Sequence, residues 1–148
     1  MTDSSENQLN TGLLLFLPYR ALETRVFEAI REAGFTDITL AQARILQRIG
    51  PDGTRLTDLA EQARVTKQTT GALVQVLEDS GYVRRGPDPT DARARLVCIA
   101  ERGTAAGVIA ARTVAEVEKE WRAHLGTRRY ARLRETLLAL REITDPYQ

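Results

Sequence analysis

One short segment interrupts the helical pattern of this chain. Apolar residues recur at helical spacing on both sides of residues 82–100, which read YVRRGPDPTDARARLVCIA. Within that segment, two short runs, 82–85 and 95–99, flank a loop that contains two prolines, a glycine and two aspartates. This pattern is typical of a β-hairpin with a long loop. We therefore expect a mainly helical chain with one small hairpin.

Helical spacing and capping residues divide the rest of the chain into six predicted helices. Thr39 and Gln42 have the spacing of a capping box, and Thr57 and Thr66 can each cap a later helix. Pro18 predicts a kink or a late start in the first helix. The predicted ranges are 9–33, 40–49, 58–63, 67–80, a fifth helix from 101 to a break at Gly126, and a sixth that ends before Pro146.

The charge of the chain is balanced overall but uneven locally. The 148 residues include 21 Lys or Arg and 20 Asp or Glu, so the formal net charge of +1 gives no evidence for a nucleic-acid partner. Residues 81–99, by contrast, hold four arginines and two aspartates. The apolar fraction of 43% predicts a globular core, and the length predicts one domain.

The residue types that most catalysis needs form no pattern here. The chain has one histidine, His124, and one cysteine, Cys98, and it lacks the spacing of a metal site, a nucleophile elbow, a P-loop or a dinucleotide fingerprint. We therefore expect no enzyme activity, no metal and no cofactor.

The single cysteine suits a cytoplasmic location. The N-terminus lacks the basic region of a signal peptide, and the apolar run LLLFL is too short to span a membrane.

Two short helices joined by a tight turn and followed by a hairpin form a winged helix-turn-helix, which is the expected fold class. The second of these helices begins with small polar or basic residues: Thr66, Lys67, Gln68, Thr69 and Thr70. Free N–H groups at a helix start favour a phosphate, and Gln or Thr side chains can reach base edges. The same residues also suit a plain cap with solvated neighbours, and helix-turn-helix modules can bind protein instead. The basic hairpin favours DNA.

Residues 56–103 resemble the core of a MarR-family transcriptional regulator. The matching motifs are Leu77-Glu78, Gly81-Tyr82-Val83, the wing Asp88-Pro89-Thr90-Asp91-Ala92-Arg93, and Ile99-Ala100-Glu101-Arg102-Gly103 at the start of the fifth helix. The resemblance implies a single MarR-like chain, 1–148, with a DNA-binding lobe over 38–100 and dimerisation helices over 9–33 and 101–146. It also implies a homodimer that binds a pseudo-palindromic operator of double-stranded DNA, and we expect a repressor.

The wing supplies four further candidates for DNA contact: Arg84, Asp91, Arg93 and Arg95. Asp91 can accept hydrogen bonds from Arg93 or Arg95 and hold that guanidinium extended toward a minor groove or its phosphates. A solvated surface ion pair of little energetic value is the alternative.

Three positions depart from the family pattern. Ala72 and Ala92 stand where arginine is frequent, and Ala100 stands where a capping threonine is common. The two missing arginines and the near-neutral charge support an alternative function, a winged-helix protein-interaction module without DNA binding. The arginines of the hairpin, together with Lys67, favour DNA binding.

The resemblance also implies a small-molecule effector, because aromatic acids and phenols bind between the two lobes in the family. The candidate ligand-binding residues are Tyr19, Arg20 and Trp121, although packing in a core is the commoner fate of aromatic side chains. Apolar residues in the outer helices exceed what the small lobe can cover. The candidates for the partner surface of a dimer are Leu13, Phe16, Leu133, Leu137 and Leu140.

Overall fold

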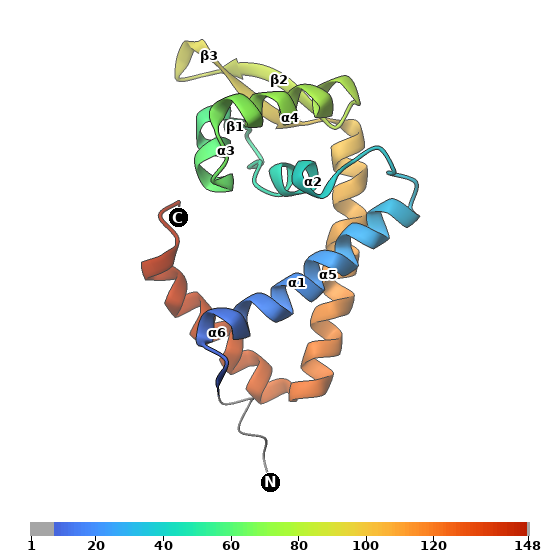
Figure 1. The fold of residues 1–148 in the computed structure, drawn as a ribbon, viewed down its shortest axis with the longest axis vertical. Coiled ribbons are helices and arrows are strands. Elements are labelled where there is room, and N and C mark those ends of the chain that lie inside the picture. The colour runs from blue at the N-terminus through green and yellow to red at the C-terminus, as the bar shows by residue number, and fades with distance from the viewer. Residues whose placement is uncertain (1–7, 148) are drawn as a thin grey trace. The chain divides into compact units, whose positions relative to one another are not determined.

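The structure, a computed structural model, describes residues 8–147, which contain six helices and three strands (Figure 1). Four helices, a hairpin and two further helices follow one another as predicted, so the mainly helical winged helix-turn-helix fold class is confirmed. The elements are α1 (Thr11–Glu32), α2 (Leu40–Leu46), β1 (Thr54–Arg55), α3 (Leu56–Ala63), α4 (Lys67–Asp79), β2 (Val83–Asp88), β3 (Asp91–Ile99), α5 (Glu101–Leu125) and α6 (Thr127–Thr144).

Capping decides where α2 begins, whereas a strand decides where α3 begins. The predicted capping box is present: the Gln42 N–H donates to Thr39 Oγ1 at 3.2 Å, and the Thr39 N–H donates to Gln42 Oε1 at 2.9 Å. The predicted cap at Thr57 is wrong. Arg55 precedes α3 without a side-chain cap, because it is still part of β1 and the strand runs directly into the helix. Thr57 therefore lies inside α3.

The start of α1 and the end of α2 also differ from the prediction. The Asn10 side chain accepts the N–H of Leu13 at 2.9 Å and caps α1, so α1 does not start late and Pro18 lies inside the helix. At the other boundary, α2 ends at Leu46, three residues before the predicted end. Local patterns locate helices well and their ends less well.

The hairpin is longer and its loop shorter than predicted. β2 pairs with β3 in antiparallel register from Val83↔Ile99 to Pro87↔Arg95, and the next pair is Asp88↔Asp91. The prediction of a long loop is wrong because Pro87, which lacks an N–H group, is tolerated on the edge strand β2. The jump in register leaves residues 92–94 of β3 outside the ladder, as a bulge beside the tip.

A third strand, β1, completes the sheet in the order β1-β3-β2. It pairs Thr54 with Val97 and Arg55 with Leu96. The sequence pattern did not predict β1, because two residues are too few to show an alternating pattern and their pairing partners lie about forty residues further along the chain.

The contacts within the chain divide it into two compact units, Met1–Ala111 and Arg112–Gln148, with the boundary inside α5. The first unit has a hydrophobic core to which α1, α2, α3, α4, the sheet and the start of α5 contribute. Its buried members are Ile30, Ile38, Ile45, Leu59, Val74, Leu77, Tyr82, Val83, Val97 and Ala106. Helix α4 packs against α2, α3 and β2, and this packing fixes its outward face.

The second unit contains the remainder of α5 and α6. Tyr130 of α6 is buried, and the guanidinium of Arg122 on α5 lies 4.8 Å from the centre of its ring. Arg134 of α6 donates to Glu118 of α5 at 3.4 Å. Among residues 8–147, no helix is both long enough and apolar enough to cross a bilayer.

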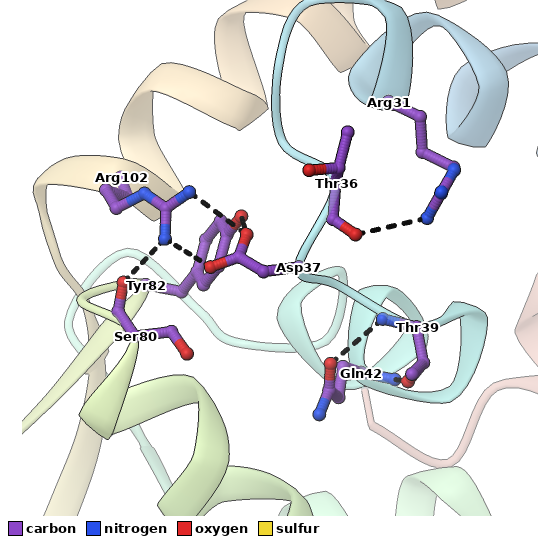
Figure 2. A network of polar contacts seen from close by, with 8 residues as sticks. All are labelled: Arg31, Thr36, Asp37, Thr39, Gln42, Ser80, Tyr82 and Arg102. Atoms are coloured by element: carbon purple, nitrogen blue, oxygen red, sulfur yellow. Dashed lines mark hydrogen bonds and ion pairs between the residues drawn. The ribbon is translucent and has the colours of Figure 1, made fainter.

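A polar network joins three segments at the base of the hairpin. Figure 2 shows Arg102, at the start of α5, and Tyr82, before β2, converging on Asp37 in the α1–α2 loop. Arg102 donates through Nη1 and Nη2 to the two carboxylate oxygens of Asp37, at 2.7 and 3.0 Å, and its Nη1 also donates to the carbonyl of Ser80 at 2.8 Å. The Tyr82 hydroxyl donates to Asp37 Oδ1 at 2.6 Å. The Arg102 guanidinium also covers the Tyr82 ring, 4.4 Å from its centre.

Candidate nucleic-acid interface

The first turn of α4 presents polar groups to solvent. Thr66 caps the helix: its Oγ1 accepts the N–H of Thr69 at 3.1 Å and donates to Thr69 Oγ1 at 2.9 Å. Lys67, Gln68 and Thr69 are exposed. Val74 and Leu77 hold the opposite face of the helix in the core. The helix start therefore combines outward-facing side chains with the backbone dipole that favours an anion.

Thr70 does not belong to this outward-facing set. Its side chain is fully buried, and its hydroxyl donates to the carbonyl of Thr66 at 2.9 Å. A buried hydroxyl that bonds back to the preceding turn has its donor satisfied within the helix and cannot reach a base or phosphate. The prediction that Thr70 contacts DNA therefore conflicts with its buried position.

Three of the predicted wing residues have exposed guanidinium groups. Arg84 lies on β2, Arg93 in the bulge of β3 and Arg95 next to that bulge. Within residues 8–147, none of these three groups takes part in an ion pair. Their positive charge is therefore available to a phosphate backbone. Arg85 differs, because its Nε donates to Glu78 of α4 at 3.1 Å.

Asp91 contacts Arg93 in a different way from the one predicted. Its Oδ1 accepts the backbone N–H of Arg93 at 2.9 Å and does not bond to the guanidinium. Aspartates at turns commonly accept an N–H two residues further along, because the short side chain reaches that group without strain. Asp91 therefore orients the backbone of the bulge and not the end of an arginine side chain.

A separate ion pair holds the tip of the wing, and the sequence analysis missed it. Arg55 of β1 donates through Nε to Asp88 Oδ2 at 2.7 Å and through Nη2 to Thr90 Oγ1 at 3.1 Å. Thr90 in turn donates to Asp88 Oδ1 through its N–H, at 2.8 Å, and through its hydroxyl, at 2.7 Å. The Asp88 side chain is only 4% exposed. The hydrogen bonds from Thr90, with the Arg55 guanidinium, lower the pKa of Asp88 to about 2.

The candidate effector residues lie in both units. Tyr19 of α1 is exposed, and its hydroxyl donates to Glu23 at 3.2 Å. Glu23 also accepts two hydrogen bonds from Arg44 of α2, at 2.9 and 2.7 Å. Arg20 is exposed, with its guanidinium 5.5 Å from the centre of the neighbouring phenylalanine ring. Trp121 is half-buried on α5, in the second unit.

The winged helix-turn-helix matches a known family in sequence and in fold. Residues 36–94 match the sequence model of the MarR family. A transcriptional regulator from Thermotoga maritima is 26% identical, with a TM-score of 0.64 over 90% of this chain and 93% of that chain. The protein named MarR is also 26% identical, with a TM-score of 0.68 over 90% and 96% of the two chains.

A third solved structure is a MarR family protein from Mycobacterium tuberculosis in complex with salicylic acid. It is 25% identical, with a TM-score of 0.64 over 91% of this chain and 98% of that chain. No curated protein gives a significant match. The family match over residues 36–94 and the structural likeness over nine-tenths of the chain show that this chain has the winged helix-turn-helix fold of the MarR-family transcriptional regulators that it resembles.

Proposed function

We propose that this chain is a sequence-specific DNA-binding regulator that acts as a homodimeric repressor. The proposal rests on one observation: a single lobe exposes two sets of polar and basic side chains, one on α4 and one on the wing. Lys67, Gln68 and Thr69 are exposed at the start of α4, while Arg93 and the other two unpaired wing arginines extend the positive surface. In this assignment α4 reads base edges in a major groove, and the wing arginines meet phosphates or a minor groove.

The lobe over 38–100 is the proposed DNA-binding part, and the helices over 9–33 and 101–146 are the proposed dimerisation part. Exposed apolar side chains support the proposed dimerisation part. The five predicted partner-surface residues are between 38% and 48% exposed: Leu13, Phe16, Leu133, Leu137 and Leu140. Apolar surface of this extent is what a second copy of the chain covers in a homodimer.

A small aromatic acid is the proposed effector, by analogy with the salicylic acid bound to the relative from Mycobacterium tuberculosis. Tyr19 and Arg20, both on α1 of the first unit, are its proposed contacts, and Trp121 stays a separate candidate on α5. Tyr19 bonds to Glu23, which also accepts from Arg44. A ligand carboxylate can compete with Glu23 for the guanidinium of Arg44, since both are planar acceptors of paired N–H donors.

The alternative function, a winged-helix module that binds protein, is favoured by the formal net charge of +1 and by Ala72 and Ala92. Binding to duplex DNA separates the two functions. A gel shift with fragments of the genome that encodes the chain, at low and moderate salt, is expected to retain specific fragments. A chain that shifts no fragment at low salt would instead be a protein-binding module.

Mutations in the wing and in α4 are expected to change DNA binding in different ways. Arg93→Ala removes one contact to the DNA backbone, so affinity falls for all sequences and the slope of log K against log salt decreases by about 1. Gln68→Ala instead reduces the difference in binding free energy between operator and random DNA by roughly 1–3 kcal/mol. The salt slope stays nearly unchanged. Gln75→Ala is the matched control, because Gln75 lies further along α4 and donates to Asp79. Equal effects of the two glutamine variants would contradict base reading by Gln68.

A further inference from the structure

The backbone ladder of the hairpin holds the wing only up to its last regular pair. β2 and β3 stay in register as far as Pro87↔Arg95, and beyond that pair only Asp88↔Asp91 remains. Arg93 lies within the three residues that leave the ladder. Strand pairing alone therefore leaves the direction of the tip, and with it the direction of Arg93, weakly determined.

A side chain from the opposite edge of the sheet supplies the missing constraint. Because the strand order is β1-β3-β2, Arg55 on β1 crosses the central strand to reach Asp88 on β2. Its two donors bind two consecutive parts of the tip, the carboxylate of Asp88 and the hydroxyl of Thr90. The Asp88 carboxylate also accepts the Thr90 N–H, so the turn is closed onto the same anchor.

The other end of this contact is the helix-turn-helix. Arg55 immediately precedes α3, and α3 packs against α4. The bridge from Arg55 to Asp88 and Thr90 therefore joins the wing tip to the first helix of the motif. A second tie, from Arg85 to Glu78, joins the root of the wing to α4 at 3.1 Å.

We propose that Arg55 is a positioning residue for DNA binding, which orients the wing tip through Asp88 and Thr90 so that Arg93 faces the DNA backbone. The inference rests on the proposed function of the chain. A tip that is already oriented loses less conformational entropy when it meets DNA, which makes the contact of Arg93 tighter. Arg55 itself is neutralised by Asp88 and makes no contact with DNA in this assignment.

A purely electrostatic role for the pair makes the opposite prediction for Asp88. Asp88→Ala removes a negative charge and frees the guanidinium of Arg55, so simple attraction to phosphates predicts tighter binding. Positioning predicts weaker binding, since the tip loses its anchor. The sign of the change in affinity therefore distinguishes the two roles.

The experiment measures fluorescence anisotropy of a labelled mixed-sequence duplex of about 30 base pairs, long enough for two half-sites one helical turn apart. The proteins are the full-length wild type, Arg55→Ala, Asp88→Ala, Arg93→Ala and the double variant Arg55→Ala/Arg93→Ala, over a salt series. Arg31→Ala, which removes one positive charge from the end of α1, controls for net charge. Circular dichroism and the unfolding midpoint of each variant confirm that it is folded.

Arg55→Ala and Arg93→Ala are each expected to weaken binding roughly tenfold, the loss that follows from one hydrogen bond to a charged group. Asp88→Ala is expected to weaken binding too. The double variant should bind within about twofold of Arg93→Ala, because both changes remove the same contact. Without DNA, hydrogen exchange of peptides covering residues 88–95 should accelerate in Arg55→Ala and Asp88→Ala and remain unchanged in Arg93→Ala.

Two results would overturn the inference while leaving the proposed function intact. One is that the losses from Arg55→Ala and Arg93→Ala multiply and the salt slope of the double variant falls by about 2, as for two independent phosphate contacts. The other is tighter binding by Asp88→Ala with unchanged exchange at the tip. If instead the wild-type chain binds no duplex at low salt, the proposed function fails, and the inference fails with it.

Discussion

Asp88 and Asp91 flank the same two-residue turn and have different structural roles. Asp88 is buried and accepts from Arg55 and Thr90, whereas Asp91 is exposed and accepts only the backbone N–H of Arg93. The difference arises from position, because the buried carboxylate lies on the sheet side that Arg55 can reach. One acid therefore anchors the tip to β1, and the other shapes the bulge.

Replacement of Asp91 by asparagine or alanine tests whether its backbone hydrogen bond matters for DNA binding. Both changes remove the same negative charge, but only asparagine keeps an oxygen that can accept the Arg93 N–H. Asp91→Asn is therefore expected to bind duplex DNA at least as tightly as the wild type, and Asp91→Ala roughly fivefold more weakly than Asp91→Asn. Equal affinity of the two variants, measured by anisotropy, would show that only the charge of Asp91 matters.

At the scale of the elements, the start of α5 lies very close to the root of the hairpin. Gly103 is buried there, and a Cβ atom on it would collide with the carbonyl oxygen of Tyr82. The absence of a side chain lets α5 approach the root of the hairpin closely enough for Arg102 to reach Asp37. The glycine and the arginine together join α5 to the winged helix-turn-helix.

Two glycines in α5 are expected to respond to alanine in opposite ways. Gly103→Ala forces α5 away from Tyr82, so it should lower the free energy of unfolding by roughly 1–3 kcal/mol. Gly107 lies one turn later, with open space around its Cβ position, so Gly107→Ala should raise stability by about 0.5–1 kcal/mol through helix propensity. Urea denaturation of both variants measures the two changes, and destabilisation of equal size in both would contradict the close approach at Gly103.

The polar network at the same junction predicts a dependence of stability on pH. Hydrogen bonds from Arg102 and Tyr82 lower the pKa of Asp37 to about 2, from about 4 in an unfolded chain. Since the folded state holds the proton less tightly, this stabilisation is complete above about pH 4 and is lost as pH falls toward 2.

Asp37→Asn is therefore expected to lower the unfolding midpoint near neutral pH by roughly 2–4 °C, a modest shift because the carboxylate is half-exposed. The difference from the wild type should shrink as the pH falls through the acid range. Burial and the hydrogen bond to Asp37 also raise the pKa of Tyr82 to about 12, so the network should weaken again above about pH 10. Asp52→Asn, at an exposed turn, is the control, and a midpoint difference for Asp37→Asn that does not depend on pH would contradict this account.

At the scale of the whole molecule, the exposed apolar residues of α1 and α6 are better explained by a dimer than by a monomer. An operator with two-fold symmetry requires two copies of α4, whose centres lie about 34–36 Å apart when they enter successive major grooves. One copy of the wing and α4 offers few positive groups for phosphate contacts, namely Lys67 and the exposed wing arginines. In the proposed dimer, two linked copies bind DNA together, which compensates for weak individual contacts.

Light scattering at micromolar concentration is expected to give twice the chain mass of 16.5 kDa. Replacing Leu137 and Leu140 by aspartate buries charge in the proposed interface, so this double variant should shift toward the monomer mass. Val76→Asp changes a similarly exposed apolar residue of α4, outside the proposed interface, and should leave the mass unchanged. A wild-type chain of monomer mass, or a double variant that remains dimeric, would contradict the proposed surface.

The sequence by itself predicted the features that depend on neighbouring residues. The capping of α2 by Thr39 and of α4 by Thr66 could be predicted because a cap links residues only three apart. The hairpin could be located because apolar runs flank a turn, and the polar start of α4 could be located because it follows a tight turn. The exposed wing arginines were found in the same way, as a local excess of positive charge.

Only the tertiary structure decided the features that depend on distant residues. Arg55 meets Asp88 across 33 positions, and Arg102 meets Asp37 across 65, so no local pattern could pair them. Thr70 follows three exposed neighbours of similar polarity, and only the packing of α4 against its lobe turns it inward. Folding brings together groups that lie far apart in the sequence. The contact of Arg55 with Asp88, which anchors the wing, can therefore be seen only in the folded chain.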